Sequence, residues 1–143
     1  MKKPFLGLIL FFLVFSSCKK YSDGPSFSLL SKKERLCNDW VLSSHLLNDE
    51  DVTEDSLSIK MVIDKDGTYS ISETYDAMGQ LQGNYSNGKW AFGDSKDILY
   101  FYENGVENPT STFKIKELRN KELKLLEEFT SIDVVHTYTY VKD

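Results

Sequence analysis

The chain has 143 residues, of which 41% are hydrophobic and 27% are charged, a composition typical of one folded domain and not of a disordered chain. Its formal net charge is −5, and its 17 basic residues are spread among 22 acidic ones without forming a basic stripe. Because binding to nucleic acid needs clustered Lys and Arg, we expect no nucleic acid partner.

The amino-terminal segment, residues 1–17, has the layout of a secretory signal peptide. Lys2 and Lys3 give a positive start, residues 5–15 carry no charge, and two small serines precede Cys18. The apolar run is shorter than the about 20 residues that a membrane-spanning helix needs. We therefore interpret residues 1–17 as an export signal.

The serine pair followed directly by Cys18 resembles the lipobox of bacterial lipoproteins, with Phe15 at a position where that family most often has Leu. The resemblance implies that the Cys18 thiol is alkylated with a diacylglyceryl group, that the chain is cut just before it, and that the new amino terminus is acylated. Two or three acyl chains anchor a protein stably, so the implied partner is a lipid bilayer and the implied location is the bacterial cell envelope, on the outer membrane. The alternative is an ordinary signal peptide cleaved near Cys18.

Removal of residues 1–17 takes away two lysines and lowers the formal charge from −5 to −7. If Cys18 carries lipid, Cys37 is the remaining thiol, which leaves no internal disulfide and no cysteine-based metal site. We interpret Cys37 as a small buried residue at a helix end. Residues 18–27 are polar, contain Gly and Pro, and are expected to be a flexible tether between lipid and domain.

The domain itself is expected to span residues 28–143 and to begin with one short helix over 28–37, where Leu and Cys recur at helical spacing and Ser28 or Ser31 is a possible cap. After the helix the hydrophobic period changes to two, which is typical of half-buried strands, and Asp-Gly, Gly-Asp and Arg-Asn turns separate them. The Asn87-Gly88 pair favours a bulge or a turn inside a longer strand. The pattern predicts about eight strands, near 39–47, 57–64, 67–75, 80–92, 97–103, 110–118, 121–128 and 133–141.

Eight sequentially paired antiparallel strands hide their edges by curling until the last pairs with the first. We therefore expect an all-β fold: an eight-stranded antiparallel up-and-down barrel preceded by one short α-helix. A barrel of this size is just wide enough to be filled by side chains or to hold one small ligand.

A second resemblance covers roughly residues 29–141 and rests on the order of short motifs, which are Asn-Asp-Trp-Val-Leu at 38–42, Asp-Gly-Thr-Tyr at 66–69, Gly-x-Trp-x-Phe at 88–92, Ile-Leu-Tyr-Phe at 98–101, Phe-x-Ile-x-x-Leu at 113–118 and Glu-Leu-x-Leu at 122–125. In this order they resemble the small lipocalin-like lipoproteins of Bacteroidetes-type bacteria. The resemblance implies a membrane-tethered lipocalin-like barrel with a ligand-binding or interaction role, and it brings no catalytic residues. The Gly-x-Trp of true lipocalins is here Asn38-Asp39-Trp40.

Aromatic residues recur on one alternating face of the predicted strands. Two interpretations are open: they line a cavity for a small apolar or glycan ligand, or they fill an ordinary core. The candidate pocket residues are Trp40, Tyr69, Tyr75, Trp90, Phe92, Phe101, Phe113, Tyr138 and Tyr140.

Two acidic stretches contain oxygen ligands of the kind that calcium prefers. Residues 64–73 match part of a calcium loop, but Val62 stands at its first position and Asp66-Gly67 also suits a β-turn. Residues 48–55 hold five carboxylates, which a solvated loop also explains. We predict a turn and a loop there, and no metal site.

His45 and His136 are the only histidines, and they fall on the first and last predicted strands. Those strands are neighbours in a closed barrel, so the pair is able to meet and, with a carboxylate, to bind a metal or move protons. We favour the simpler interpretation, a pair of surface or rim histidines. The chain has no Gly-x-Ser-x-Gly, phosphate-loop or His-Glu-x-x-His motif, so we expect no enzyme, no cofactor and no catalytic residue.

These observations predict a membrane-anchored envelope lipoprotein whose barrel binds a small apolar or glycan ligand. The alternative is a non-catalytic structural or interaction module with a filled barrel, which docks on another envelope protein.

Overall fold

The computed structural model describes residues 29–143. The predicted signal peptide at 1–17, the lipidated Cys18 and the tether at 18–27 lie outside the described residues. Within residues 29–143, no helix has both the length and the hydropathy to cross a bilayer.

The one helix of this part, α1, runs over Lys32–Leu36 and is shorter than the predicted 28–37. It begins at a capping box, in which the Ser31 side chain accepts from the Glu34 backbone N–H while the Glu34 carboxylate accepts from the Ser31 N–H. Leu29 lies before this cap and is 90% exposed, so it does not share a buried helical face. The helix ends at Cys37, whose backbone is extended.

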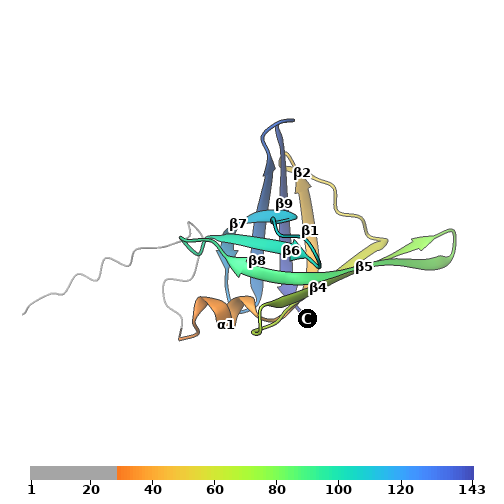
Figure 1. The fold of residues 1–143 in the computed structure, drawn as a ribbon. Coiled ribbons are helices and arrows are strands. Elements are labelled where there is room, and N and C mark those ends of the chain that lie inside the picture. Colours follow the sequence, from red (N-terminus) through yellow and green to blue (C-terminus); the bar gives the residue numbers. More distant parts are fainter. Residues whose placement is uncertain (1–28) are drawn as a thin grey trace, which may run out of the picture.

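The strands form one antiparallel sheet that closes on itself, because β9 pairs with both β8 and β1 (Figure 1). Eight strands make the barrel, which confirms the predicted fold class. The two-residue β2 is an additional short strand beside β1. The strands are β1 (Asp39–Leu47), β2 (Glu50–Asp51), β3 (Leu57–Ile63), β4 (Thr68–Ala77), β5 (Gln80–Phe92), β6 (Ile98–Glu103), β7 (Ser111–Leu118), β8 (Glu122–Phe129) and β9 (Val134–Lys142).

The hydrophobic core sits at the end of the barrel that α1 covers (Figure 1). Leu36 of the helix and Trp40 of β1 are both fully buried, and the Trp40 indole N–H donates to the Leu36 carbonyl at 2.8 Å. This contact joins the helix to the first strand and closes that end. The remaining core residues are Met61, Ile63, Tyr69, Trp90, Leu99, Phe101, Ile115, Leu118, Leu123, Leu125 and Tyr140.

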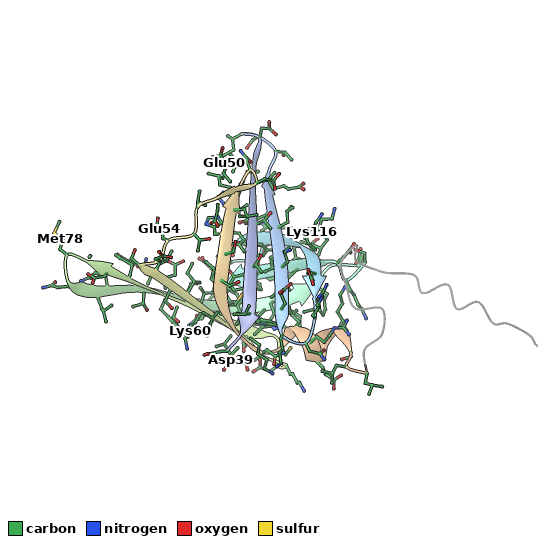
Figure 2. All side chains as sticks on the ribbon, turned by 180° about the vertical axis from the view of Figure 1, so that it is seen from behind. Asp39, Glu50, Glu54, Lys60, Met78 and Lys116 are labelled. Carbon is green, nitrogen blue, oxygen red and sulfur yellow. The ribbon has the colours of Figure 1, made fainter. Side chains whose placement is uncertain are left out.

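The hairpin of β4 and β5 projects beyond the barrel (Figures 1 and 2). The two strands pair as far as Ala77 and Gln80, whereas β3 accompanies β4 only to Tyr75 and β6 pairs with β5 only from Gly88 onward. The hairpin turn contains Gly79 with a positive φ of 80°. Its outer part carries exposed apolar side chains, which are Tyr75, Met78, Leu81 and Tyr85.

The Asn87-Gly88 pair forms neither the turn nor the bulge that its sequence favours, because the β4–β5 register runs through it without a shift. A Cβ atom on Gly88 would overlap the carbonyl oxygen of Tyr102 and lie 3.0 Å from the Cα of Glu103. The absence of a side chain at Gly88 therefore allows β6 to approach β5 closely.

Candidate functional site: the barrel interior and its rim

The predicted aromatic face is largely on the inside of the barrel. Tyr69 stacks on Phe101 with ring centroids 4.2 Å apart, and Phe101 meets Phe113 edge to face at 5.5 Å. Phe113 in turn meets Tyr138 at 6.1 Å. These contacts make a continuous row of rings that leads from the buried core towards the end of the barrel opposite α1.

The nine predicted pocket residues fall into three groups. Trp40, Tyr69, Trp90, Phe101 and Tyr140 belong to the buried core, and Phe92, Phe113 and Tyr138 are partly buried against it. The indole N–H of Trp90 donates to the Asp64 carbonyl at 2.8 Å. This bond holds the Trp90 ring in place, in the same way that the bond to the Leu36 carbonyl holds Trp40. Tyr75 is 37% exposed and lies on the projecting hairpin, so the structure does not bring it to the others.

The two histidines meet at the end of the barrel opposite α1. A shift in the β1–β9 register between Leu42 and Ser44 puts His45 opposite Tyr138, whose ring stacks on the imidazole at 4.6 Å. His45 Nε2 lies 2.9 Å from His136 Nδ1, so one of these two nitrogens carries the shared proton. Phe129 covers His136 edge to face at 5.7 Å. The two histidines, which were expected on neighbouring strands, therefore meet on the inner side of the rim.

The pKa of His45 lies below its ordinary value of 6.5, first because burial disfavours the imidazolium and second because of repulsion from His136, against a smaller attraction to Asp51. A base whose folded pKa is lowered binds protons more readily in the unfolded chain. The stability contributed by neutral His45 is therefore complete above pH 6.5 and is lost as the pH falls through the folded pKa.

We expect His136→Gln to raise the pKa of His45 while leaving it below its ordinary value, because the substitution removes the neighbouring charge but not the burial. An NMR titration of the His45 ring proton measures this. Thr137→Ser changes the residue next to His136 in the chain and is the control, in which the pKa of His45 should stay as in the parent protein. An unchanged His45 pKa in His136→Gln would show that the two rings do not interact.

Glu127 is a rim residue that sequence reasoning missed. It follows Leu123 and Leu125 at the same alternation on β8, so it faces the interior, and it pairs in register with His136. Burial raises the pKa of its carboxyl group. It has no hydrogen-bond or ion-pair partner among residues 29–143. The alternation Leu-x-Leu-x-Glu at residues 123–127 is the sequence feature that could have placed Glu127 on the inward face.

Tyr138 adds a second polar group to the rim. Burial, followed by the charges of Glu127 and Glu73, raises the pKa of Tyr138 to about 12, so its hydroxyl stays protonated at neutral pH. Glu73 lies two residues beyond Ile71 on β4 and shares its inward face. The rim thus combines aromatic rings, a phenol hydroxyl and inward carboxylates.

The two acidic stretches have ordinary structural roles. At residues 64–73, Gly67 takes a positive φ of 96° in the β3–β4 turn, and the Asp66 carboxylate accepts from the Thr68 N–H at 2.9 Å. At residues 48–55, Glu50 and Asp51 form the short β2. Residues 29–143 contain no group of three or more His, Cys, Asp or Glu side chains arranged to hold a metal ion.

Comparison with known proteins gives fold-level relatives. No family model and no curated protein sequence matches the chain. Among solved structures, Japanin from Rhipicephalus appendiculatus bound to cholesterol superimposes with a TM-score of 0.54 and 11% identity, over 74% of each chain. The odorant-binding protein from bovine nasal mucosa gives a TM-score of 0.49 and 13% identity, over 82% of this chain and 77% of its own.

The closed eight-stranded barrel, its single preceding helix and the superposition on Japanin define the class of fold as a lipocalin-like β-barrel. At 11% identity the likeness concerns the fold alone.

Proposed function

We propose that this protein is a lipid-anchored envelope protein that binds a small ligand at the end of its barrel opposite α1. The observation that carries the binding role is the row of rings from Phe101 through Phe113 to Tyr138, which reaches a rim holding the unpaired carboxylate of Glu127. Ligand sites in proteins are mostly apolar and contain a few polar groups that fix orientation. The cholesterol in Japanin, a protein of the same fold, adds support for an apolar ligand.

The rim chemistry narrows the ligand class. A flat apolar body or a sugar ring stacks well on aromatic side chains, and a hydroxyl or amine on it would donate to Glu127. Glu127 is partly buried and has no partner for its carboxylate among residues 29–143, so a ligand that supplies a donor gains from pairing with it. We therefore propose an apolar or glycan ligand that carries at least one hydrogen-bond donor.

Native mass spectrometry of the protein purified from its own cell envelope tests this proposal. We expect a discrete extra mass under native conditions that disappears on denaturation, and a lower occupancy in Glu127→Gln. Glu128→Gln is the matched control, because Glu128 is adjacent in the strand but exposed. Equal occupancy in the two variants would argue against Glu127 as the anchor, and absence of any extra mass would argue against barrel binding.

The proposal of lipid anchoring at Cys18 has a separate test. We expect Cys18→Ala to move the protein from the membrane pellet to the soluble fraction, or to leave an uncut precursor, because no thiol remains to accept the diacylglyceryl group. Cys37→Ala is the control, since Cys37 lies in the folded domain at the end of α1. Processed, membrane-bound protein in Cys18→Ala would contradict anchoring at this residue.

A second candidate function is favoured by the projecting hairpin. Leu81 is 78% exposed, and it lies with Tyr85 on the same face of β5, beyond the reach of β6. Exposed apolar side chains on a protruding element are typical of protein interaction surfaces. We propose docking on another envelope protein as the alternative role, and crosslinking from the hairpin in intact cells would test it.

A further inference from the structure

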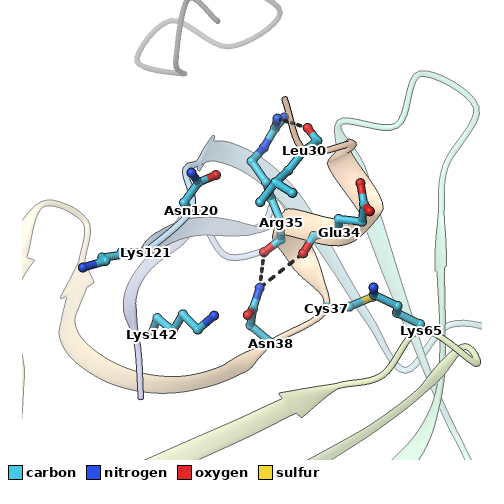
Figure 3. Close-up of a pocket in the computed structure, with 9 residues that line it drawn as sticks. All are labelled: Leu30, Glu34, Arg35, Cys37, Asn38, Lys65, Asn120, Lys121 and Lys142. Carbon is cyan, nitrogen blue, oxygen red and sulfur yellow. Dashed lines mark hydrogen bonds between the residues drawn. The ribbon is translucent and has the colours of Figure 1, made fainter. Parts of the chain in front are cut away.

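A hollow lies at the end of the barrel opposite the rim, beside α1 (Figure 3). It has a volume of about 450 Å³ and is bounded by the helix, the β3–β4 turn, the β7–β8 turn and the end of β9. Four of its lining residues are basic and one is acidic. The basic residues are Arg35, Lys65, Lys121 and Lys142, and the acidic one is Glu34.

Three carboxylates near this hollow already accept hydrogen bonds from other residues. Glu34 accepts from the Ser31 N–H at 2.8 Å as part of the capping box. Asp66 accepts from Thr68, and Asp143 accepts from Lys60 at 2.7 Å. Among residues 29–143, none of the four basic side chains of the hollow forms an ion pair with a carboxylate, although Lys65 is close enough to help lower the pKa of the Glu34 carboxyl. The lining of the hollow therefore has a net positive charge, with four basic residues against one acidic residue.

The Arg35 side chain is held in place by a hydrogen bond to the backbone. Its Nη1 donates to the Leu30 carbonyl at 2.7 Å, while its Nε is buried and has no acceptor in the described part of the chain. Asn38, at the base of the hollow, is fixed by bonds from Nδ2 to the carbonyls of Glu34 and Arg35. Figure 3 shows the Lys142 ammonium directed towards Asn38, whereas Lys121 extends outward. Lysine side chains are flexible, so Lys121 is able to turn towards a bound anion.

We propose that this hollow is a binding site for a phosphate ester. A guanidinium matches two phosphate oxygens, and the lysines supply the further positive charge that a phosphate dianion requires. A carboxylate ligand has a single negative charge and would not require so many basic residues. The volume is greater than one bare ion requires, so it leaves room for the group that the phosphate esterifies. The source is either a soluble phosphate ester or the head group of a phospholipid. Because the site lies away from the rim, the proposal does not depend on the barrel ligand.

A chain of residues 19–143 is suitable for the test, because every strand and core residue that the structure describes lies between Leu36 and Lys142. It also lacks Cys18, so the result does not depend on lipidation. We expect glycerol 3-phosphate, titrated at constant ionic strength, to shift the backbone NMR signals of Asn38, Lys65 and Asn120 saturably. Arg35→Gln and Lys142→Gln should each weaken binding about tenfold, since each removes one charge-assisted contact.

Lys114→Gln, on the outer wall at β7, is the matched control and should bind like the parent protein. Lys142→Gln changes an exposed side chain, so it keeps the test valid even if Arg35→Gln loosens the helix. Vesicles of phosphatidylglycerol identify the source. Vesicle binding that the same two substitutions weaken assigns the site to a lipid head group, and binding of glycerol 3-phosphate alone assigns it to a soluble ester. No saturable shift, or equal affinity in all variants, would overturn the proposal.

Discussion

Trp40→Ala is expected to lower the free energy of unfolding by about 3–5 kcal/mol, the range for truncating a large buried aromatic side chain. Trp40 is fully buried, and its indole N–H bonds to the Leu36 carbonyl at the end of α1. The substitution therefore opens a cavity and also detaches the helix from the first strand. Since domains of this size are stable by about 5–15 kcal/mol, the loss takes up much of the total.

Urea denaturation followed by fluorescence and circular dichroism measures this effect. Trp40→Phe is an informative companion, because it keeps most of the apolar volume and removes the hydrogen bond; we expect it to lose only about 1–2 kcal/mol. Tyr85→Ala, on the exposed hairpin, should stay within about 0.5 kcal/mol of the parent protein. A small loss in Trp40→Ala would show that the helix does not depend on this contact.

The sequence was sufficient to predict the barrel because its strands repeat a period of two between short turns. The predicted 39–47 and 80–92 coincide with β1 and β5, and the other barrel strands differ from their predicted bounds by one or two residues. The helix was predicted too long because leucines before Ser31 have helical spacing, whereas the capping box starts the helix only after that residue. Local hydrogen bonding decided that boundary, not periodicity.

The rim was harder to predict because it depends on pairing between distant strands. Strict alternation from Trp40 would place His45 on the outer wall, and the register shift between Leu42 and Ser44 reverses this. Such bulges leave no clear mark in a serine-rich stretch. Tyr75 was assigned to the interior because its strand was expected to stay within the barrel, but β4 and β5 continue past their neighbours as a free hairpin. The length of a hairpin beyond a barrel is set by where the adjacent strands end.

Gly88→Ala is expected to destabilise the barrel by about 3 kcal/mol or more, at the upper end of overpacking effects. Gly88 pairs with Glu103, and the added methyl group would overlap the Tyr102 carbonyl oxygen and lie 2.9 Å from its carbon. These are backbone atoms of the neighbouring strand, so a side-chain rotation cannot relieve the contact. β6 has to move away from β5, which weakens the ladder that carries Trp90 and Phe101 into the core.

Gly79→Ala is the matched control, because it separates steric overlap from backbone strain. Gly79 has a positive φ of 80°, and a Cβ there meets no atom within 4 Å. We therefore expect only the conformational cost, about 1 kcal/mol. Urea midpoints for the two variants give the comparison, and the Gly88 variant should also lose near-ultraviolet circular dichroism from the displaced rings. If the two substitutions lower the free energy of unfolding equally, Gly88 is required for its backbone conformation and not for the close approach of β6.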